Sequence, residues 1–322
     1  MNKTSQKKRH KKRRKPVVRI IGRTLKFIIL AILFGAIYSV GVTIHENIKA
    51  ENTIEAFKAR AVEVIEETVD YNGTPQTRRY HIVPRETSYE LADTRSVFYD
   101  ETKLELGQKG DIFTTQQSPF PMIPAFHFFM TTYYGGHAAI NDGQNRFYEA
   151  TGFPDDDESL LDIMLHPGNE PHDFSVTAAR NPRNIWLKPG YRPKTDPSYP
   201  AFGEYYRKEF IGLRVKNITD EQLDDVIAFS QDIVDKDSIY NFLFFLDMEY
   251  KYYCTDLVSR AYQHVLVPED EQRQYSEALN DDGFITSVND LLLSDDTYMA
   301  FYVEIIDDIV NIYHLEDVDP DA

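Results

Sequence analysis

The sequence predicts an α+β domain, in which an antiparallel sheet packs with helices, preceded by one membrane-spanning helix and a helical stalk. Three observations lead to this prediction. Residues 27–44 are 18 successive residues without a charge. From about residue 105, short apolar runs are separated by turn residues, as in strands. Two later segments, which begin near residues 219 and 254, repeat apolar residues at helical spacing.

The uncharged run predicts a membrane anchor. Its length is about the minimum that spans a hydrocarbon core of roughly 30 Å. Residues 1–45 contain twelve Lys and Arg and no acidic residue. By the positive-inside rule, residues 1–26 then form a basic cytoplasmic tail, and the chain after the membrane helix at 27–44 lies outside the cytoplasm. A cleaved signal peptide is the alternative, but the run is long for one and no small-x-small site follows it. A single-pass anchor in the cell membrane is therefore favoured.

Residues 45–100 are expected to form a helical stalk and a connector. Apolar residues at three- and four-residue spacing predict a helix over 46–70, which either pairs as a dimeric coiled coil or docks on the main domain. These residues are Ile54, Phe57, Ala61, Ile65 and Val69. The main domain is expected over 101–310 and an acidic tail over 311–322.

Strands are expected at four places in the main domain, and a helix is expected after the last of them. The strands are predicted at 110–113, 136–141 with 146–150, 184–188 and 210–216. Thr219 and Gln222 match a capping box that opens a helix.

Charge and composition exclude several classes of function. Residues 46–322 hold 23 basic and 52 acidic residues, a net charge of −29 (23 − 52), so nucleic acid is not expected as a partner. No cofactor is expected, because the chain has no phosphate loop or dinucleotide fingerprint. No metal is expected either. The acidic run 155–158 lacks the spacing of a calcium loop, and His166 and His172 stand without further zinc ligands.

The only cysteine of the chain, Cys254, is the first candidate for chemistry. Apolar residues at 254, 257, 258, 261, 262 and 265 place it in the first turn of an amphipathic helix. There, unpaired backbone N–H groups and the helix dipole favour an ionised sulfur. The competing interpretation is packing, since free cysteines are among the most buried residue types.

His137 and Glu149 are candidate partners of the thiol. They lie on two predicted strands that flank a loop at Asp142 and Gly143. A loop of three or five residues, spanning 142–144 or 141–145, sets them directly opposite each other on one face, whereas a two-residue turn sets them on opposite faces. A carboxylate beside an imidazole holds it in one tautomer, and the imidazole can then accept the thiol proton. Taken singly, His137 is more often satisfied by a backbone carbonyl and Glu149 more often exposed.

Four segments together resemble a known family. They are 110–112 (GDI), 136–140 (GHAAI), 148–150 (YEA) and 253–258 (YCTDLV), the last followed by Ala261 and Tyr262. In this order they resemble the circularly permuted papain-like amidases of the YiiX/YaeF type, within the superfamily of NlpC-type cell-wall peptidases. The family has Tyr-Cys-Ser-Glu-Leu-Val where this chain has Thr255 and Asp256 after the cysteine. The resemblance covers about 105–300, including 284–293, whereas the anchor, the stalk and an acidic insertion at 154–183 lie outside it.

The resemblance implies a permuted papain-like (NlpC-type) fold with Cys254 as nucleophile, His137 as general base and Glu149 as the residue that orients it. Tyr240 and Tyr253 are candidates to line the substrate cleft, although aromatic residues before a helix more often belong to the core. The expected function is a membrane-anchored extracytoplasmic cysteine amidase or peptidase acting on cell-wall peptides through a thioacyl-enzyme. The alternatives are a lipid acyltransferase or hydrolase, for example on a lipid amide, and a non-catalytic envelope scaffold that dimerises through the stalk.

Overall fold

The computed structural model describes residues 16–244, 246, 248–272, 278–280 and 285–318, so most of the predicted basic tail lies outside the described residues. The chain divides into two units, 1–46 and 47–322. The first contains most of helix α1 (Pro16–Ala59), the one described helix that is long and apolar enough to cross a membrane. A signal sequence near the N-terminus meets the same criteria of length and hydropathy, so the choice between anchor and signal peptide stays a prediction.

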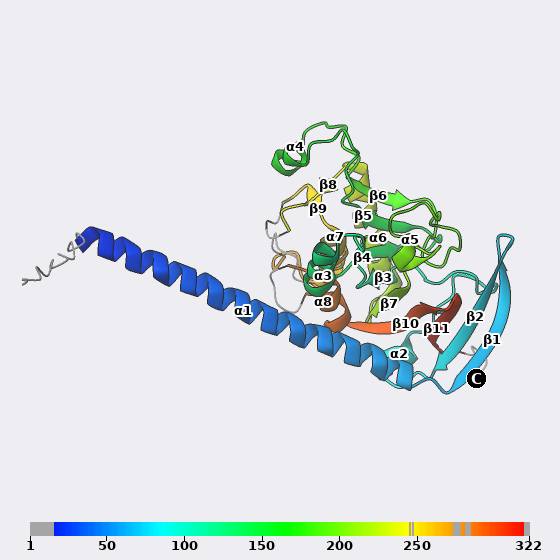
Figure 1. Cartoon of the computed structure of the whole chain (residues 1–322). Helices are drawn as coiled ribbons and strands as arrows, with labels where there is room; N and C mark the ends of the chain where they lie inside the picture. The colour runs from blue at the N-terminus through cyan, green and yellow to red at the C-terminus, as the bar shows by residue number, and fades with distance from the viewer. Residues whose placement is uncertain (1–15, 245, 247, 273–277, 281–284, 319–322) are drawn as a thin grey trace, which may run out of the picture. The chain divides into compact units, whose positions relative to one another are not determined.

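The second unit is built on a nine-stranded sheet whose order is β1-β2-β11-β10-β7-β3-β4-β5-β6 (Figure 1). All neighbours are antiparallel except β11 and β2, so the expected α+β class with a mostly antiparallel sheet is confirmed. The strands are β1 (Glu63–Tyr71), β2 (Thr74–Val83), β3 (Ile112–Thr115), β4 (His137–Asn141), β5 (Phe147–Ala150), β6 (Ala178–Asn181), β7 (Glu209–Val215), β10 (Thr297–Ile306) and β11 (Ile309–Leu315). Two short strands, β8 (Ile239–Tyr240) and β9 (Lys251–Tyr252), pair separately.

The helices that follow α1 are mostly short. They are α2 (Ser88–Ala92), α3 (Pro124–Tyr133), α4 (Leu160–Leu165), α5 (Tyr199–Phe202), α6 (Asp220–Asp235), α7 (Cys254–Leu266) and α8 (Val288–Leu293). The predicted capping box of Thr219 and Gln222 is confirmed at the start of α6. Helices α6 and α7 contact each other and pack on the β4–β6 end of the sheet (Figure 1). This packing brings α7 against the strands that carry His137 and Glu149.

The helix predicted over 46–70 is wrong beyond residue 59. Helix α1 ends at Ala59, and β1 and β2 form a hairpin closed by Asn72 and Gly73, both with positive φ (52° and 84°). Asn-Gly is the preferred sequence of a two-residue hairpin turn, and β1 is rich in Val, Ile and Thr, which favour strands. The strand preference therefore overrides the helical spacing of Ile65 and Val69.

The remaining stalk residues belong to the main domain. Asn47 begins the compact unit, and Ile54 and Phe57 are buried in its core. Lys58 pairs with Glu304 of β10 at 3.0 Å. The helical part of the apolar stripe, Ile54 and Phe57, is thus buried within its own domain, as in the docked alternative, and is not free to pair as a coiled-coil dimer.

Two other boundaries differ from expectation. The acidic tail does not begin at 311, because β11 lies inside the sheet between β2 and β10, and only the residues from Glu316 onward follow it. The strand expected over 184–188 is absent from the structure, whereas the other predicted strands are present as β3, β4, β5 and β7. The backbone N–H of Trp186 donates to the Asn184 side chain (3.2 Å), which turns this segment so that Trp186 and Leu187 enter the core without strand pairing.

An aromatic cluster fills the core under the centre of the sheet. Phe113 lies in its middle, with ring centroids 4.7 Å from Phe147, 5.4 Å from Trp186, 5.9 Å from Phe210 and 5.1 Å from Phe301. Edge-on and offset contacts of this kind add to the stabilisation from apolar burial. The cluster anchors β3, β5, β7 and β10 and thereby sets the positions of the neighbouring site strands.

Candidate active site

Cys254 is the first residue of α7, as predicted. Tyr253 precedes it at the N-cap position in an extended conformation (φ −98°, ψ 169°), without a capping hydrogen bond from its side chain. The apolar face that includes Leu257, Val258 and Ala261 is fully buried, whereas Cys254 itself is only partly buried. Backbone N–H groups in a first helical turn have no partner within the helix, so an anion at this position is stabilised. The packing of α7 therefore leaves Cys254 partly exposed at an electropositive helix end.

His137 and Glu149 meet in a buried pair. His137 Nε2 lies 2.7 Å from Glu149 Oε2, and each residue is 7 % exposed. The second carboxylate oxygen, Oε1, accepts a hydrogen bond from Asn181 on β6 (2.9 Å). With Nε2 engaged by the carboxylate, Nδ1 is the nitrogen that can face the thiol.

The strand register differs from the expected one by two residues. Ile140 pairs with Tyr148 and Asn141 with Phe147, so His137 and Glu149 are diagonal neighbours and not directly opposite each other. They share a face because the shift is even, and side chains alternate with a period of two. The connecting loop has five residues, 142–146, one residue later than the five-residue loop predicted at 141–145. Asp142 closes it by donating its N–H to the Arg146 carbonyl oxygen (2.9 Å).

Electrostatics favour an imidazolium–carboxylate pair. Burial opposes charge on both groups. The pKa of His137 is nevertheless raised well above its usual value. The interactions that raise it are with Tyr206, with the Cys254 side chain through a hydrogen bond, and with Glu149. Burial likewise acts to raise the pKa of Glu149, but hydrogen bonds with His137 and Asn181 lower it below its usual value. The structure therefore brings the three predicted side chains into one interacting group.

Aromatic residues that the sequence did not single out surround the imidazole. The Trp186 ring lies nearly parallel to it (centroids 6.2 Å apart, 20° between planes), and Tyr206 meets it edge-on at 6.3 Å. Both come from irregular segments whose path no periodicity predicts. Gly136 has no room for a side chain, because a Cβ there would lie 2.1 Å from the Gln117 carbonyl oxygen. This close contact holds the start of β4, and with it His137.

The two tyrosines predicted for the cleft differ in their surroundings. Tyr253 is buried, and its hydroxyl accepts a hydrogen bond from the Thr286 N–H (3.0 Å), so it anchors the segment before α8. Tyr240 is half-buried, and its pKa is raised, first by burial and then by its electrostatic interaction with Cys254. Of the two, Tyr240 is therefore the one whose contacts suit a cleft wall.

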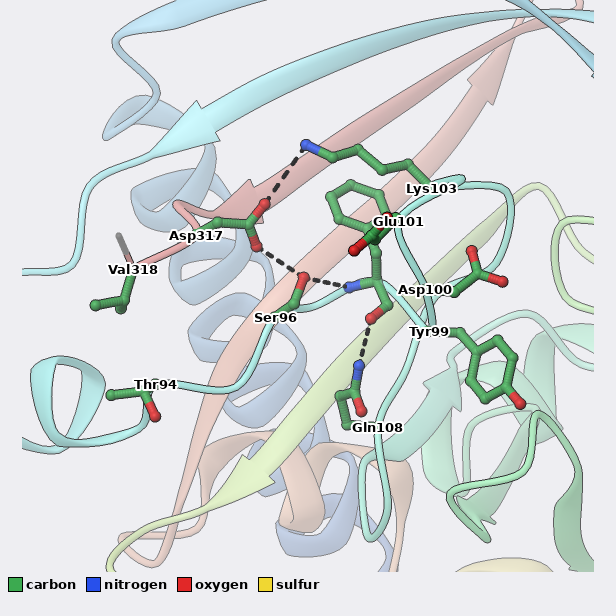
Figure 2. Close-up of a pocket in the computed structure, with 10 residues that line it drawn as sticks. Thr94, Ser96, Tyr99, Asp100, Glu101, Lys103, Gln108, Asp317 and Val318 are labelled. Atoms are coloured by element: carbon green, nitrogen blue, oxygen red, sulfur yellow. Dashed lines mark hydrogen bonds and ion pairs between the residues drawn. The ribbon is translucent and has the colours of Figure 1, made fainter. Parts of the chain in front are cut away.

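Two cavities lie away from these residues. A cavity of about 410 Å³ is lined by polar residues that are largely paired with one another, such as Lys103 with Asp317 at 3.4 Å (Figure 2). A second, of about 290 Å³, borders Glu105 and Arg146. Neither is lined by Cys254, His137 or Glu149. Among the described residues, no group of three or more His, Cys, Asp or Glu side chains could hold a metal ion.

The family resemblance included residues 284–293. Of these, residue 284 lies outside the described residues, and the others include α8. No protein-family model matches the chain, and neither a search of curated proteins nor a search of solved structures finds a match.

Proposed function

We propose that this protein is a membrane-anchored cysteine hydrolase that cleaves amide bonds, with cell-wall peptides as the first candidate substrates. The observation that carries the proposal is the buried 2.7 Å contact between His137 Nε2 and Glu149 Oε2, next to a cysteine that begins a helix. A thiol nucleophile, a base and a group that orients the base are the three parts that thiol-based acyl transfer requires.

The proposed reaction has two steps. The Cys254 thiolate attacks the amide carbonyl carbon, a C–S bond forms, and the His137 imidazolium donates its proton to the leaving nitrogen as the C–N bond breaks. Water then attacks the thioester while His137 accepts one of its protons. The C–O bond forms, the C–S bond breaks, and the thiolate and the imidazolium are restored. Backbone N–H groups at the start of α7 would stabilise the oxyanion in both steps, and Glu149 would hold the imidazole in position.

The proposal extends to the fold of the domain and to its location relative to the membrane. We infer a variant of the permuted papain-like fold, because the strands with His137 and Glu149 precede the cysteine helix in the chain and pack against it. We also infer that the apolar part of α1 spans the cell membrane once, with the basic residues in the cytoplasm and the domain from Asn47 outside. Wall peptides would then be the amides within reach of the domain.

One observation favours a lipid acyl group as a second candidate substrate. Aromatic rings follow one another from Phe129 on α3 to Tyr134 (5.7 Å), from Tyr134 to Phe244 (5.2 Å), and from Phe244 to Tyr240 (6.2 Å). Tyr240 interacts electrostatically with Cys254, so this series of rings leads towards the thiol. A surface of aromatic rings suits an acyl chain better than a polar peptide.

The test uses the full chain reconstituted in vesicles, supplied separately with soluble stem-peptide fragments and with N-acyl and O-acyl lipids in the same vesicles. We expect product from one class of substrate, and an acyl adduct on the Cys254 peptide by mass spectrometry. Both should be lost in Cys254→Ala, and product should be strongly reduced in His137→Ala. His264→Ala is the matched control, because His264 lies exposed on the same helix α7. Cleavage that survives Cys254→Ala would end the thiol mechanism, and an unreactive thiol with no turnover of either substrate would favour a scaffold role.

A further inference from the structure

Helix α3 presents an aromatic face to solvent. The helix buries none of its residues, and Phe126, Phe128 and Phe129 are 41 %, 71 % and 44 % exposed. Large exposed side chains continue the face beside the helix: Met122, Ile123 and Phe153. Phe120 joins these parts, with ring centroids 5.0 Å from Phe126 and 5.6 Å from Phe153. A contiguous exposed apolar surface of this kind marks an interaction site.

Most of this face comes from a segment that has no charged side chains. Residues 112–141 contain no Asp, Glu, Lys or Arg, although residues 46–322 carry a net charge of −29 (23 − 52). An acidic surface is repelled by anionic lipid headgroups, whereas an uncharged aromatic face is not. Aromatic side chains are also the residues that prefer the boundary between headgroups and acyl chains. The composition of the face therefore suits a lipid surface.

The chain itself keeps α3 near the end of the apolar segment. The Asn47 side chain donates to the carbonyl oxygen of Thr132, in the last turn of α3 (2.9 Å). The uncharged run ends at Ile44, three residues earlier, so at most about 11 Å of chain separates that residue from Asn47. Whatever angle α1 makes with the domain, the C-terminal end of α3 is thus within a short distance of the last uncharged residue of the run.

We infer that the aromatic face of α3, formed by Met122, Ile123, Phe126, Phe128, Phe129 and Phe153, inserts into the outer surface of the bilayer that holds the anchor. This inference rests on the anchor of the proposed function and not on the chemistry of Cys254. Only residues 134–136 separate α3 from His137, so a docked α3 holds the start of β4 at the membrane surface. The site then works on substrates presented at that surface.

The test uses the full chain in vesicles of phosphatidylcholine and phosphatidylglycerol, with a nitroxide spin label on a single introduced cysteine. Cys254→Ala removes the one native thiol. Phe128→Cys places the label on the aromatic face, and Val64→Cys is the matched control. Val64 is also apolar and exposed (56 %), and its strand follows the end of α1, about 18 Å along the helix from Asn47. Flotation of the vesicles first reports whether the anchor is inserted, and collision rates with oxygen and with a water-soluble nickel chelate then report the surroundings of each label.

We expect a several-fold higher ratio of oxygen to nickel collisions at position 128 than at position 64. Equal ratios at the two positions in chains that float with the vesicles would overturn the inference and leave the anchor intact. A label at 128 that is shielded from both reagents and broadened by a second label would overturn it in favour of contact between two copies. Chains that do not float would overturn the anchor, and the inference with it.

Discussion

Replacing Glu149 by Gln tests the electrostatic basis of the site directly. The substitution keeps the shape of the side chain and removes the charge that lies 2.7 Å from His137 Nε2. A hydrogen bond to a charged group contributes about 1.5–3 kcal/mol, and each pKa unit corresponds to about 1.4 kcal/mol. Removal of this charge should therefore lower the pKa of His137. If His137 in its charged form stabilises the thiolate, alkylation of Cys254 near neutral pH should slow by about 10- to 100-fold.

The assay is the rate of alkylation of Cys254 by iodoacetamide across pH, measured on protein whose fold is checked by the near-ultraviolet circular dichroism of Trp186. Glu90→Gln is the matched control. Glu90 is also buried and paired, with Arg60 at 2.9 Å, but it is remote from the thiol in sequence and contacts. It should lose stability without slowing alkylation. An unchanged rate and pH profile in folded Glu149→Gln would refute the coupling between carboxylate, imidazole and thiol.

The interaction between His137 and Glu149 also predicts how the free energy of unfolding depends on pH. The pKa of Glu149 is lowered on folding, so its contribution is present above the unfolded pKa of about 4.3 and is lost as pH falls. The pKa of His137 is raised, so its contribution is present below the unfolded pKa of about 6.5 and is lost as pH rises towards the folded pKa. The difference in unfolding free energy between wild type and Glu149→Gln should therefore be largest between about pH 4.3 and 6.5.

Three further substitutions probe the domain around the site. Burial raises the pKa of Glu105 to about 7, so the stability of Glu105→Gln relative to wild type should increase as pH rises from about 4.5 to 7, reaching about 3 kcal/mol. Denaturant unfolding at pH 5 and pH 8 measures this difference in stability. A difference that does not depend on pH would contradict the prediction. Arg214→Met leaves the fully buried Asp111 without its partner at 2.8 Å and should cost about 3–5 kcal/mol, against about 1 kcal/mol or less for the exposed Arg79→Met. Gly136→Ala sets a Cβ 2.1 Å from a backbone oxygen and should lower both the melting temperature and the rate of Cys254 alkylation; a variant with wild-type values of both would show that the start of β4 can move freely.

Local patterns in the sequence were sufficient to predict several elements. The apolar spacing after Cys254 predicted α7, the capping box of Thr219 predicted the start of α6, and alternation predicted β7. These patterns depend on residues within one or two turns or on one strand, so no knowledge of distant neighbours is needed. The parity argument for His137 and Glu149 is of the same kind, since any even shift of the hairpin keeps them on one face.

Local patterns failed where neighbours outside the segment decide the structure. The spacing of Ile65 and Val69 fits a helix, yet β2 and β11 provide a sheet edge on which the segment pairs as a strand. The segment that carries Trp186 is as apolar as a strand but enters the core without strand pairing. In both cases tertiary packing outweighs local preference, because hydrogen bonding and burial at the final position contribute more than intrinsic propensity does.

The sequence by itself therefore determined the chemistry available to this protein: one thiol at a helix start, one imidazole and one carboxylate on neighbouring strands, and an apolar segment before an acidic domain. Only the tertiary structure decided that the imidazole and the carboxylate share a buried hydrogen bond with support from Asn181, and that the aromatic face of α3 stays uncovered. The physical reason is that residue types follow from the sequence, whereas distance, burial and exposure arise from contacts among segments that lie far apart along the chain.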